Sequence, residues 1–312
     1  MSPATPTFRQ WSGRRVLVTG HRGFIGAAVS RRLREAGAEL RGVSRGQSGA
    51  ETEPFPVVPC DLSDLDDCRR AIAQTKPDCI LHLAGHPFGA RELSRVLPTL
   101  RDNLVATVNL LTAAAEAQTG RILITGSLEE PTDESDPVPS SPYAASKWAG
   151  SVYARMFSRL FSLPVVIARV FMVYGPGQGE PTKLIPSVIA SLSRGEAPRI
   201  SAGERPVDWI YVEDVVTGLL LAAETEGLDG RTIDLGTGVL TTVADVVRQI
   251  ATSFPGGPAP LFGAVPSRPF EQVRAADVAA TRRALDWAPS TSLAEGLAAT
   301  VAWARASQRT PP

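Results

Sequence analysis

The sequence has no excess charge of either sign, very little lysine and no long apolar run. Its 312 residues contain 32 Lys and Arg against 32 Asp and Glu, and only Lys76, Lys147 and Lys183 are lysines. A nucleic-acid-binding chain usually carries a basic excess, so we expect no nucleic-acid partner. Because no segment approaches the roughly 18 consecutive apolar residues of a membrane span, we expect no membrane partner.

Cysteine is also scarce. Cys60, Cys68 and Cys79 are odd in number and match no metal-ligand or redox spacing, so we expect inert thiols, no metal site and a reducing compartment. The first 13 residues lack the apolar core of an export signal. Together these features predict a cytoplasmic protein.

The hydrophobic pattern alternates between short apolar runs and helical periodicity. Residues 15–19, 39–43, 78–83 and 121–125 are apolar runs typical of buried strands, and helical spacing separates them. Strands joined through helices pair in parallel by right-handed crossovers. The chain is therefore predicted to be α/β, a Rossmann-type doubly wound parallel sheet with a smaller, interleaved C-terminal lobe.

A glycine-rich turn joins the first strand to the first helix. Its sequence, Thr-Gly-His-Arg-Gly-Phe-Ile-Gly at 19–26, has three glycines at intervals of three. Glycines permit a tight turn and close approach of the backbone to a pyrophosphate, and the helix N-terminus supplies unpaired amides. The spacing matches that of the short-chain dehydrogenase/reductases. It predicts dinucleotide contacts at Gly20, Arg22, Gly23, Phe24, Ile25 and Gly26.

The end of the second strand predicts which dinucleotide is bound. An NAD site usually places a carboxylate there to bind the ribose 2′-hydroxyl, but residues 40–50 contain no acid. Ser44 and Arg45 suit a 2′-phosphate. NADP is therefore favoured over NAD, although Arg45 as a solvated loop residue remains an alternative.

Tyr143 and Lys147 stand four residues apart behind Ser141-Pro142, a favourable helix start. This spacing places both side chains on one helix face. A nearby ammonium favours the phenolate and is expected to lower the tyrosine pKa. Ser127, just after the strand at 121–125, is well placed to hydrogen-bond the same substrate oxygen. The pattern predicts a Ser-Tyr-Lys catalytic site.

These motifs, in this order, resemble the extended short-chain dehydrogenase/reductases, the NAD-dependent epimerase/dehydratase family acting on nucleotide-activated sugars. The segments at 82–85, 169–176, 208–215 and 285–289 follow the family order as well. The resemblance implies a nucleotide-diphosphate-sugar substrate. It also implies cofactor contacts at Asp61, Leu62, Leu83, Ala84, Gly85, Asn103, Tyr143, Lys147 and Val170, and substrate contacts at Lys183, Arg205, Arg268 and Met172.

The sequence departs from the family pattern at two places. Met172 stands where many epimerases have asparagine, and Pro131-Thr132 replaces a usual Tyr-Gly. The segment 126–130, Gly-Ser-Leu-Glu-Glu, is similar to reductases of GDP-4-keto-6-deoxyhexoses. Glu129 occupies the position of a base used by 4,6-dehydratases, but Leu128 gives it no polar neighbour. A solvated loop is the alternative for both Glu129 and Glu130.

The expected function is therefore reduction of an NDP-4-keto-(6-deoxy)hexose at C4. The alternative is an NDP-sugar 4-epimerase with tightly bound NAD; a 4,6-dehydratase or a non-catalytic dinucleotide sensor ranks lower. Helices near 100–117 and 142–161 are expected to form a homodimer contact, as in relatives.

Composition also divides the chain. Glycine and proline become dense after about residue 170, while residues 232–235 still have the pattern of a sheet strand. We expect a disordered tail at 1–12, a dinucleotide-binding Rossmann domain at 13–170, and a mainly substrate-binding lobe at 171–312. Segments of this lobe at about 205–240 are expected to return to the Rossmann sheet.

Overall fold

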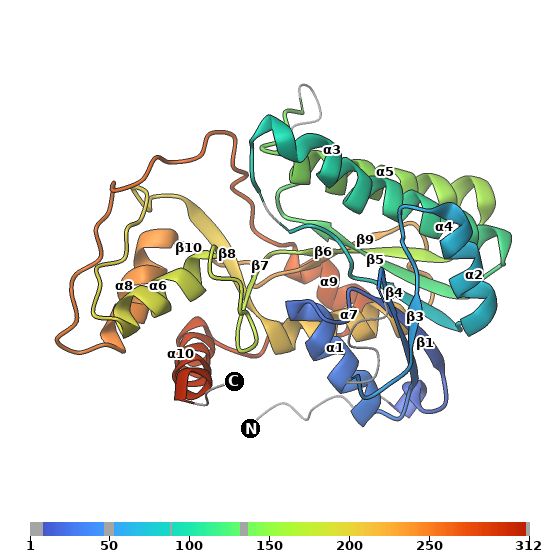
Figure 1. Cartoon of the computed structure of the whole chain (residues 1–312), viewed down its shortest axis with the longest axis horizontal. Coiled ribbons are helices and arrows are strands. Elements are labelled where there is room, and N and C mark those ends of the chain that lie inside the picture. The colour runs from blue at the N-terminus through green and yellow to red at the C-terminus, as the bar shows by residue number, and fades with distance from the viewer. Residues whose placement is uncertain (1–8, 47–52, 88, 132–136, 310–312) are drawn as a thin grey trace.

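The computed structural model describes residues 9–46, 53–87, 89–131 and 137–309. Figure 1 shows a large sheet with helices on both of its faces, and beside it a smaller lobe built around α6, α8 and α10. None of the described helices is both long enough and apolar enough to cross a membrane.

The large sheet has seven parallel strands in the order β3-β2-β1-β4-β5-β6-β9. The chain order reverses between β1 and β4, which opens a crevice at their carboxyl ends, where ligands of such sheets bind. The strands are β1 (Arg15–Thr19), β2 (Glu39–Ser44), β3 (Val57–Pro59), β4 (Cys79–His82), β5 (Arg121–Ser127), β6 (Val165–Val170) and β9 (Thr232–Leu235).

Helices cover both faces of this sheet. Across both lobes, the α-helices among the described residues are α1 (Phe24–Glu35), α2 (Leu65–Thr75), α3 (Val96–Thr99), α4 (Ala106–Glu116), α5 (Pro142–Phe161), α6 (Leu184–Ser193), α7 (Val212–Glu224), α8 (Val243–Thr252), α9 (Val278–Leu285) and α10 (Leu293–Arg309). Shorter turns are the 3-10 segments η1 (Arg9–Trp11) and η3 (Leu93–Arg95) and the π-helical η4 (Leu100–Val105).

Alternate side chains of the strands fill two separate cores. On β1, Leu17 packs toward α2, α4 and α5, whereas Val16 and Val18 pack toward α1, α7 and α9. This division follows from the two-residue period of a strand. A sheet apolar on both faces needs a helical layer on each, which explains the alternation in the sequence.

The smaller lobe has its own core and a second sheet. Its strands, in the order β10-β8-β7, are β10 (Leu240–Thr242), β8 (Pro206–Tyr211) and β7 (Met172–Tyr174). Between β8 and β10 the chain returns to the large sheet as β9, which pairs with β6. The strand expected at 232–235 is thus confirmed.

The N-terminal segment differs from the tail expected at 1–12. Residues 1–8 lie outside the described residues. Trp11 is fully buried, packed into the core beneath α1 and α7. Burial of its large indole holds η1 against the domain. The segment is too short to show a hydrophobic periodicity, so its sequence did not predict this packing.

Candidate functional site

The glycine turn, which follows the carboxyl end of β1, leaves no room for a side chain at Gly20 or Gly26. Gly20 has φ +71°, and a Cβ there would lie 2.6 Å from the Ala84 backbone nitrogen. A Cβ on Gly26 would lie 2.0 Å from the Gly20 carbonyl oxygen. Gly23 is the N-cap of α1, and no side chain within the described residues caps that helix end. The turn therefore fits the pyrophosphate of a dinucleotide, since backbone amides remain exposed at the helix start.

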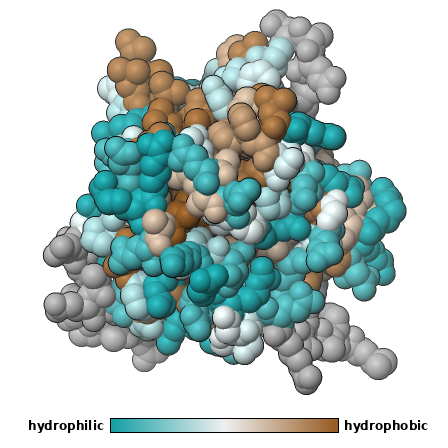
Figure 2. All heavy atoms as spheres, turned by 90° about the vertical axis from the view of Figure 1, so that its right-hand side faces the viewer, coloured by the Kyte–Doolittle hydropathy of each residue, from teal (hydrophilic) through white to brown (hydrophobic). Residues whose placement is uncertain are grey.

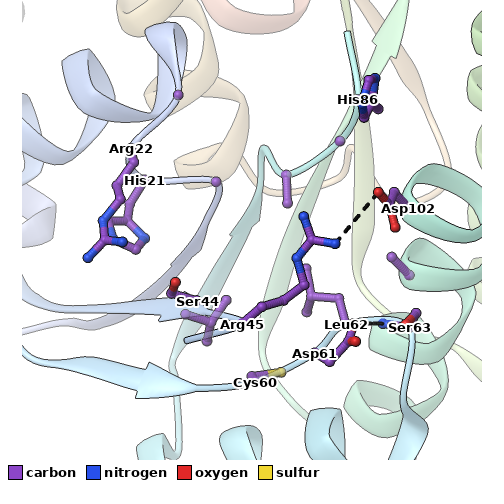
Figure 3. Close-up of a pocket in the computed structure, with 16 residues that line it drawn as sticks. His21, Arg22, Ser44, Arg45, Cys60, Asp61, Leu62, Ser63, His86 and Asp102 are labelled. Atoms are coloured by element: carbon purple, nitrogen blue, oxygen red, sulfur yellow. Dashed lines mark hydrogen bonds and ion pairs between the residues drawn. The ribbon is translucent and has the colours of Figure 1, made fainter. Parts of the chain in front are cut away.

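A cavity of about 260 Å³ opens beside this turn (Figure 3). Several predicted cofactor residues line it, namely Gly20, Arg22, Gly23, Ser44, Arg45, Asp61, Leu62, Ala84 and Gly85. The cavity is also lined by residues that were not predicted as cofactor contacts, namely His21, Val43, Cys60, Ser63, His86, Asp102 and Ala106. Phe24, Ile25 and Leu83 instead pack partly buried against the core.

Arg45 reaches across the cavity toward Asp102 (Figure 3), with 3.7 Å between its Nη1 and the carboxylate Oδ2. Asp61 accepts hydrogen bonds from the backbone nitrogen and hydroxyl of Ser63, at 3.0 and 2.8 Å. Burial opposes its ionisation, but these bonds lower the pKa of Asp61. Arg22 pairs with Glu53 at 2.7 Å. The cavity thus combines arginine side chains with an ionised carboxylate.

A buried chain of hydrogen bonds fixes the segment after β4. The Thr19 hydroxyl lies 2.8 Å from Nδ1 of His82, whose Nε2 lies 2.9 Å from the Thr107 hydroxyl. Burial lowers the pKa of His82 to about 3, so the ring is neutral. The Ala84 amide donates to Thr19 at 3.1 Å. This arrangement holds the segment at 83–85 against the glycine turn.

Asn103 links that segment to the helix bearing Tyr143 and Lys147. Its Oδ1 accepts from the His86 amide at 2.5 Å, and its Nδ2 donates to the Ser146 hydroxyl at 3.0 Å. A Cβ on Gly85 would lie 3.1 Å from Asn103 Oδ1 and 3.6 Å from the Lys147 amine. The dinucleotide turn and the Lys147 amine are therefore close neighbours.

Helix α5 begins where its sequence predicts. The Ser141 hydroxyl accepts from the Ala144 amide at 3.2 Å, and Pro142 is the first helical residue. Tyr143 and Lys147 follow one turn apart. Lys147 Nζ donates to the Thr125 carbonyl at 3.0 Å and lies 3.1 Å from the Thr125 hydroxyl. Among the described residues its hydrogen bonds go to β5, not to the phenol of Tyr143.

Burial is the largest cause of the pKa shifts of Tyr143 and Lys147. It raises the pKa of Tyr143 to about 12, although a side-chain hydrogen bond with Ser127 works in the other direction. Burial also lowers the pKa of Lys147 to about 8. The expected lowering of the tyrosine pKa is therefore wrong, because desolvation outweighs the Ser127 hydrogen bond and the Lys147 ammonium is not among the groups that shift it. Ser127 and Tyr143 are brought together as predicted.

The predicted substrate residues lie where the two lobes meet. Arg205 donates to Glu129 Oε1 at 2.7 Å and to the Gln272 carbonyl at 2.7 Å. Glu129 also accepts from the Ser140 hydroxyl at 3.1 Å. Lys183 Nζ donates to the Pro87 carbonyl at 2.5 Å. The charge of Arg268 lowers the pKa of Lys183, and the charge of Glu129 raises it. Lys183, Arg205, Arg268 and Glu129 therefore lie in one region.

Two further predicted residues, Val170 and Met172, contribute a backbone hydrogen bond and core packing, respectively. The Val170 carbonyl at the end of β6 accepts from the Leu128 amide at 3.1 Å. Met172 is partly buried between the cores of the two lobes. In the described part of the chain no group of three or more His, Cys, Asp or Glu side chains has the arrangement of a metal site.

Comparisons with known proteins agree with this geometry. The chain is 32% identical over 334 residues to a dTDP-glucose 4,6-dehydratase of Neisseria meningitidis, with 93% of each chain covered. It is 32% identical over 313 residues to a UDP-glucose 4-epimerase of Mycolicibacterium smegmatis, covering 93% of this chain and 98% of the relative. The solved UDP-glucose 4-epimerase of Thermus thermophilus in complex with NAD superimposes with a TM-score of 0.81 at 26% identity, covering 93% and 99%.

A model of the NAD dependent epimerase/dehydratase family matches residues 16–236, from the first strand to the end of β9. That range contains the glycine turn, Ser127 and the Tyr143–Lys147 pair. The chain therefore belongs to the NAD-dependent epimerase/dehydratase family and is an enzyme of the extended short-chain dehydrogenase/reductase type.

Proposed function

We propose that the protein reduces the C4 ketone of a nucleotide-diphosphate-linked 4-keto-6-deoxyhexose. The observation that supports this most is the segment Gly126 to Glu130, which has the Gly-Ser-x-Glu-Glu pattern of reductases, together with the absence of an acid at residues 40–50. Ser127 makes a side-chain hydrogen bond with Tyr143. A phenol is protonated at neutral pH and can donate the proton that ketone reduction consumes at oxygen.

In this proposal Tyr143 and Ser127 act on the substrate oxygen, and Lys147 acts on the cofactor. A nicotinamide dinucleotide, when bound, would supply the hydride. Tyr143 donates its proton to the C4 oxygen as negative charge develops there, and Ser127 holds that oxygen by a hydrogen bond. Lys147 stands beside Gly85 and holds the nicotinamide ribose in place.

The cationic region between the lobes is proposed to hold the diphosphate. Lys183, Arg205 and Arg268 supply a lysine and two fork-shaped guanidinium groups, the donors that suit phosphate oxygens. Arg205 also contacts Glu129 and Glu271, at 2.7 and 3.3 Å. A bound diphosphate would share the Arg205 guanidinium with these carboxylates.

The contacts of Glu129 argue against a 4,6-dehydratase. Its two oxygens are engaged by Arg205 and Ser140, and Leu128 beside it is buried. A base that removes a proton from a sugar carbon needs an oxygen free to face the substrate. A 4-epimerase is the second candidate, supported by the 32% identity to the M. smegmatis enzyme. It would use the same Ser127, Tyr143 and Lys147.

The function is tested with purified protein and a panel of NDP-4-keto-6-deoxyhexoses and NDP-hexoses. We expect consumption of reduced dinucleotide, followed by its absorbance, only with the 4-keto sugars. Interconversion of C4 isomers without net cofactor consumption would establish the epimerase instead. Loss of water from an NDP-hexose would establish a dehydratase.

NADP is the proposed dinucleotide, because Ser44 and Arg45 line the cavity and no acid ends β2. NAD is the alternative, supported by the NAD bound to the T. thermophilus enzyme.

We expect Arg45→Ala to weaken NADPH binding about tenfold or more, which is the contribution of one charge-assisted contact. NADH binding is expected to remain unchanged. Calorimetric titration measures both. Arg248→Ala, on α8 of the smaller lobe, is the matched control; equal losses for both dinucleotides would contradict the assignment.

We further propose that the protein is a homodimer through the η3–α3–η4–α5 surface. This surface exposes Leu93, Leu97, Val105, Val152, Leu160 and Phe161, of which Leu93 is 87% and Leu97 72% exposed. Figure 2 shows hydrophobic side chains gathered along the upper edge of the molecule, the edge to which α3 and α5 contribute in Figure 1. Exposed apolar patches of this kind mark interaction surfaces. Light scattering is expected to give twice the chain mass of 33.1 kDa; a monomer mass would contradict the proposal.

A further inference from the structure

Glu130 carries a buried carboxylate in the turn that follows β5. The proposed reaction does not use this carboxylate. Its exposed fraction is 2%. Oxygen Oε1 accepts from the Ser127 backbone nitrogen at 2.8 Å and from the Ser151 hydroxyl at 3.0 Å. The carboxylate thus ties the backbone of one proposed catalytic residue to helix α5, which carries the other two.

The surrounding backbone accommodates this carboxylate closely. A Cβ on Gly126 would lie 2.6 Å from Glu130 Oε1, so a side chain at that strand position would require the carboxylate to move. The backbone at 126–127 therefore lies close against the carboxylate. A hydrophobic side chain at 130 would leave the Ser127 amide and Ser151 hydroxyl unpaired.

The charge of Glu130 is poorly compensated. Its Oε2 lies 3.9 Å from Arg169 Nε, beyond hydrogen-bond distance, and that Nε has no hydrogen-bond partner within the described residues. Arg169 makes its closer ion pair with Asp234, at 2.9 Å. Burial raises the pKa of Glu130 despite its hydrogen bonds. A buried ion paired this loosely costs the fold stability, and such residues are retained at functional sites.

Charged groups from several elements face this carboxylate and the pair on α5. Arg169 of β6, Arg274 before α9 and Lys147 of α5 interact with Glu130. Glu129 and Glu130 both face Tyr143, and His82 of β4 faces Lys147. Burial is the larger influence on Tyr143 and Lys147, but the negative charge of Glu130 raises the pKa of each. Glu130 therefore favours the protonated form of both groups.

We propose that Glu130 is a positioning residue of the Ser127–Tyr143–Lys147 site, whose carboxylate fixes the Ser127 backbone against α5 and places a negative charge close to the tyrosine and lysine. The inference rests on the proposed roles of those three residues. Glu130→Gln is the informative variant because it keeps a carbonyl oxygen for Ser127 and Ser151 and removes only the charge. Ser151→Ala is the matched control, since it removes one hydrogen bond and no charge.

The first test needs no turnover. The chain has only three lysines, so trace acetylation over a pH series, read by mass spectrometry, follows each amine separately. In Glu130→Gln the midpoint for Lys147 is expected to fall by about one pH unit, the effect of one buried charge at several ångström. Ser151→Ala is expected to leave it unchanged, with Lys76 as internal reference. An unchanged midpoint in Glu130→Gln would overturn the proposal.

The second test separates positioning from stability. Glu130→Gln is expected to lower kcat about tenfold with KM unchanged, and to move the alkaline limb of the pH–rate profile to lower pH. Its urea midpoint at neutral pH is expected to equal or exceed that of the unsubstituted protein. The sign follows from the raised pKa, since the contribution of Glu130 to stability is fully present at low pH and is lost as pH rises through its folded-state pKa.

A lower urea midpoint, or failure to fold, would assign Glu130 a structural role and overturn the proposal. Wild-type kcat at every pH would overturn it as well. If the unsubstituted protein turns over none of the sugars, the proposed function fails. The acetylation midpoint of Lys147 then still decides whether Glu130 acts on the pair.

Discussion

Tyr143→Phe is expected to reduce turnover by about 10²- to 10⁴-fold, the usual contribution of a positioned general acid. The phenol is the one group in the proposed site that donates a proton to the substrate oxygen, and its pKa of about 12 keeps it protonated at neutral pH. Phenylalanine keeps the ring, so α5 and the dinucleotide turn remain intact. Steady-state kinetics with the accepted sugar, together with dinucleotide titration, measure the two properties separately.

Tyr153→Phe is the matched control for this substitution. Tyr153 lies on the same helix with 40% of its surface exposed, so loss of its hydroxyl is expected to change neither turnover nor binding. Retained turnover in Tyr143→Phe would contradict the proton-donor role. Lost dinucleotide binding in that variant would mean instead that the ring supports the cofactor.

The local parts of this site were predictable from sequence because local rules determine them. Ser141 and Pro142 define the start of α5, and a helix then places Tyr143 and Lys147 on one face whatever the rest of the chain does. The glycine turn is similarly local. Gly26 is required by a contact within the turn, and Gly20 by contacts with the neighbouring segment at 83–85.

The electrostatics of the site were not predictable in this way. The spacing of Tyr143 and Lys147 suggested that the ammonium governs the phenol. In the structure, burial raises the tyrosine pKa, and Lys147 donates to Thr125. Desolvation depends on what the whole chain packs around a group, so a motif contains little information about it.

Long-range pairings were missed for a related reason. Arg205 meets Glu129, which is 76 residues away in the chain, and Arg45 lies near Asp102. No periodicity or spacing relates such positions. The helix expected at 100–117 also begins differently, as the π-helical η4, before α4 starts at Ala106. Asn103 lies in this π-helical turn, where it reaches both His86 and Ser146; single π turns of this kind are frequent at functional sites.

Gly26→Ala is expected to abolish measurable dinucleotide binding, a loss of at least about 100-fold in affinity. The added methyl would lie 2.0 Å from the Gly20 carbonyl oxygen and 2.8 Å from its carbon. Backbone atoms cannot rotate away as a flexible side chain can, so the turn itself must move. Turn and helix start together form the proposed pyrophosphate site, and displacement of either misdirects its amides.

Gly179→Ala is the matched control, because nothing lies within 4 Å of a Cβ at that position and its backbone is not left-handed. Fluorescence titration with reduced dinucleotide measures binding, and circular dichroism verifies that each variant is folded. Undiminished binding by Gly26→Ala would show that the turn can relax and still receive the ligand. Lost binding by both variants would point to a general loss of structure. Loss confined to Gly26→Ala locates the dinucleotide at this turn, because of the two substitutions only this one places a methyl group against backbone atoms.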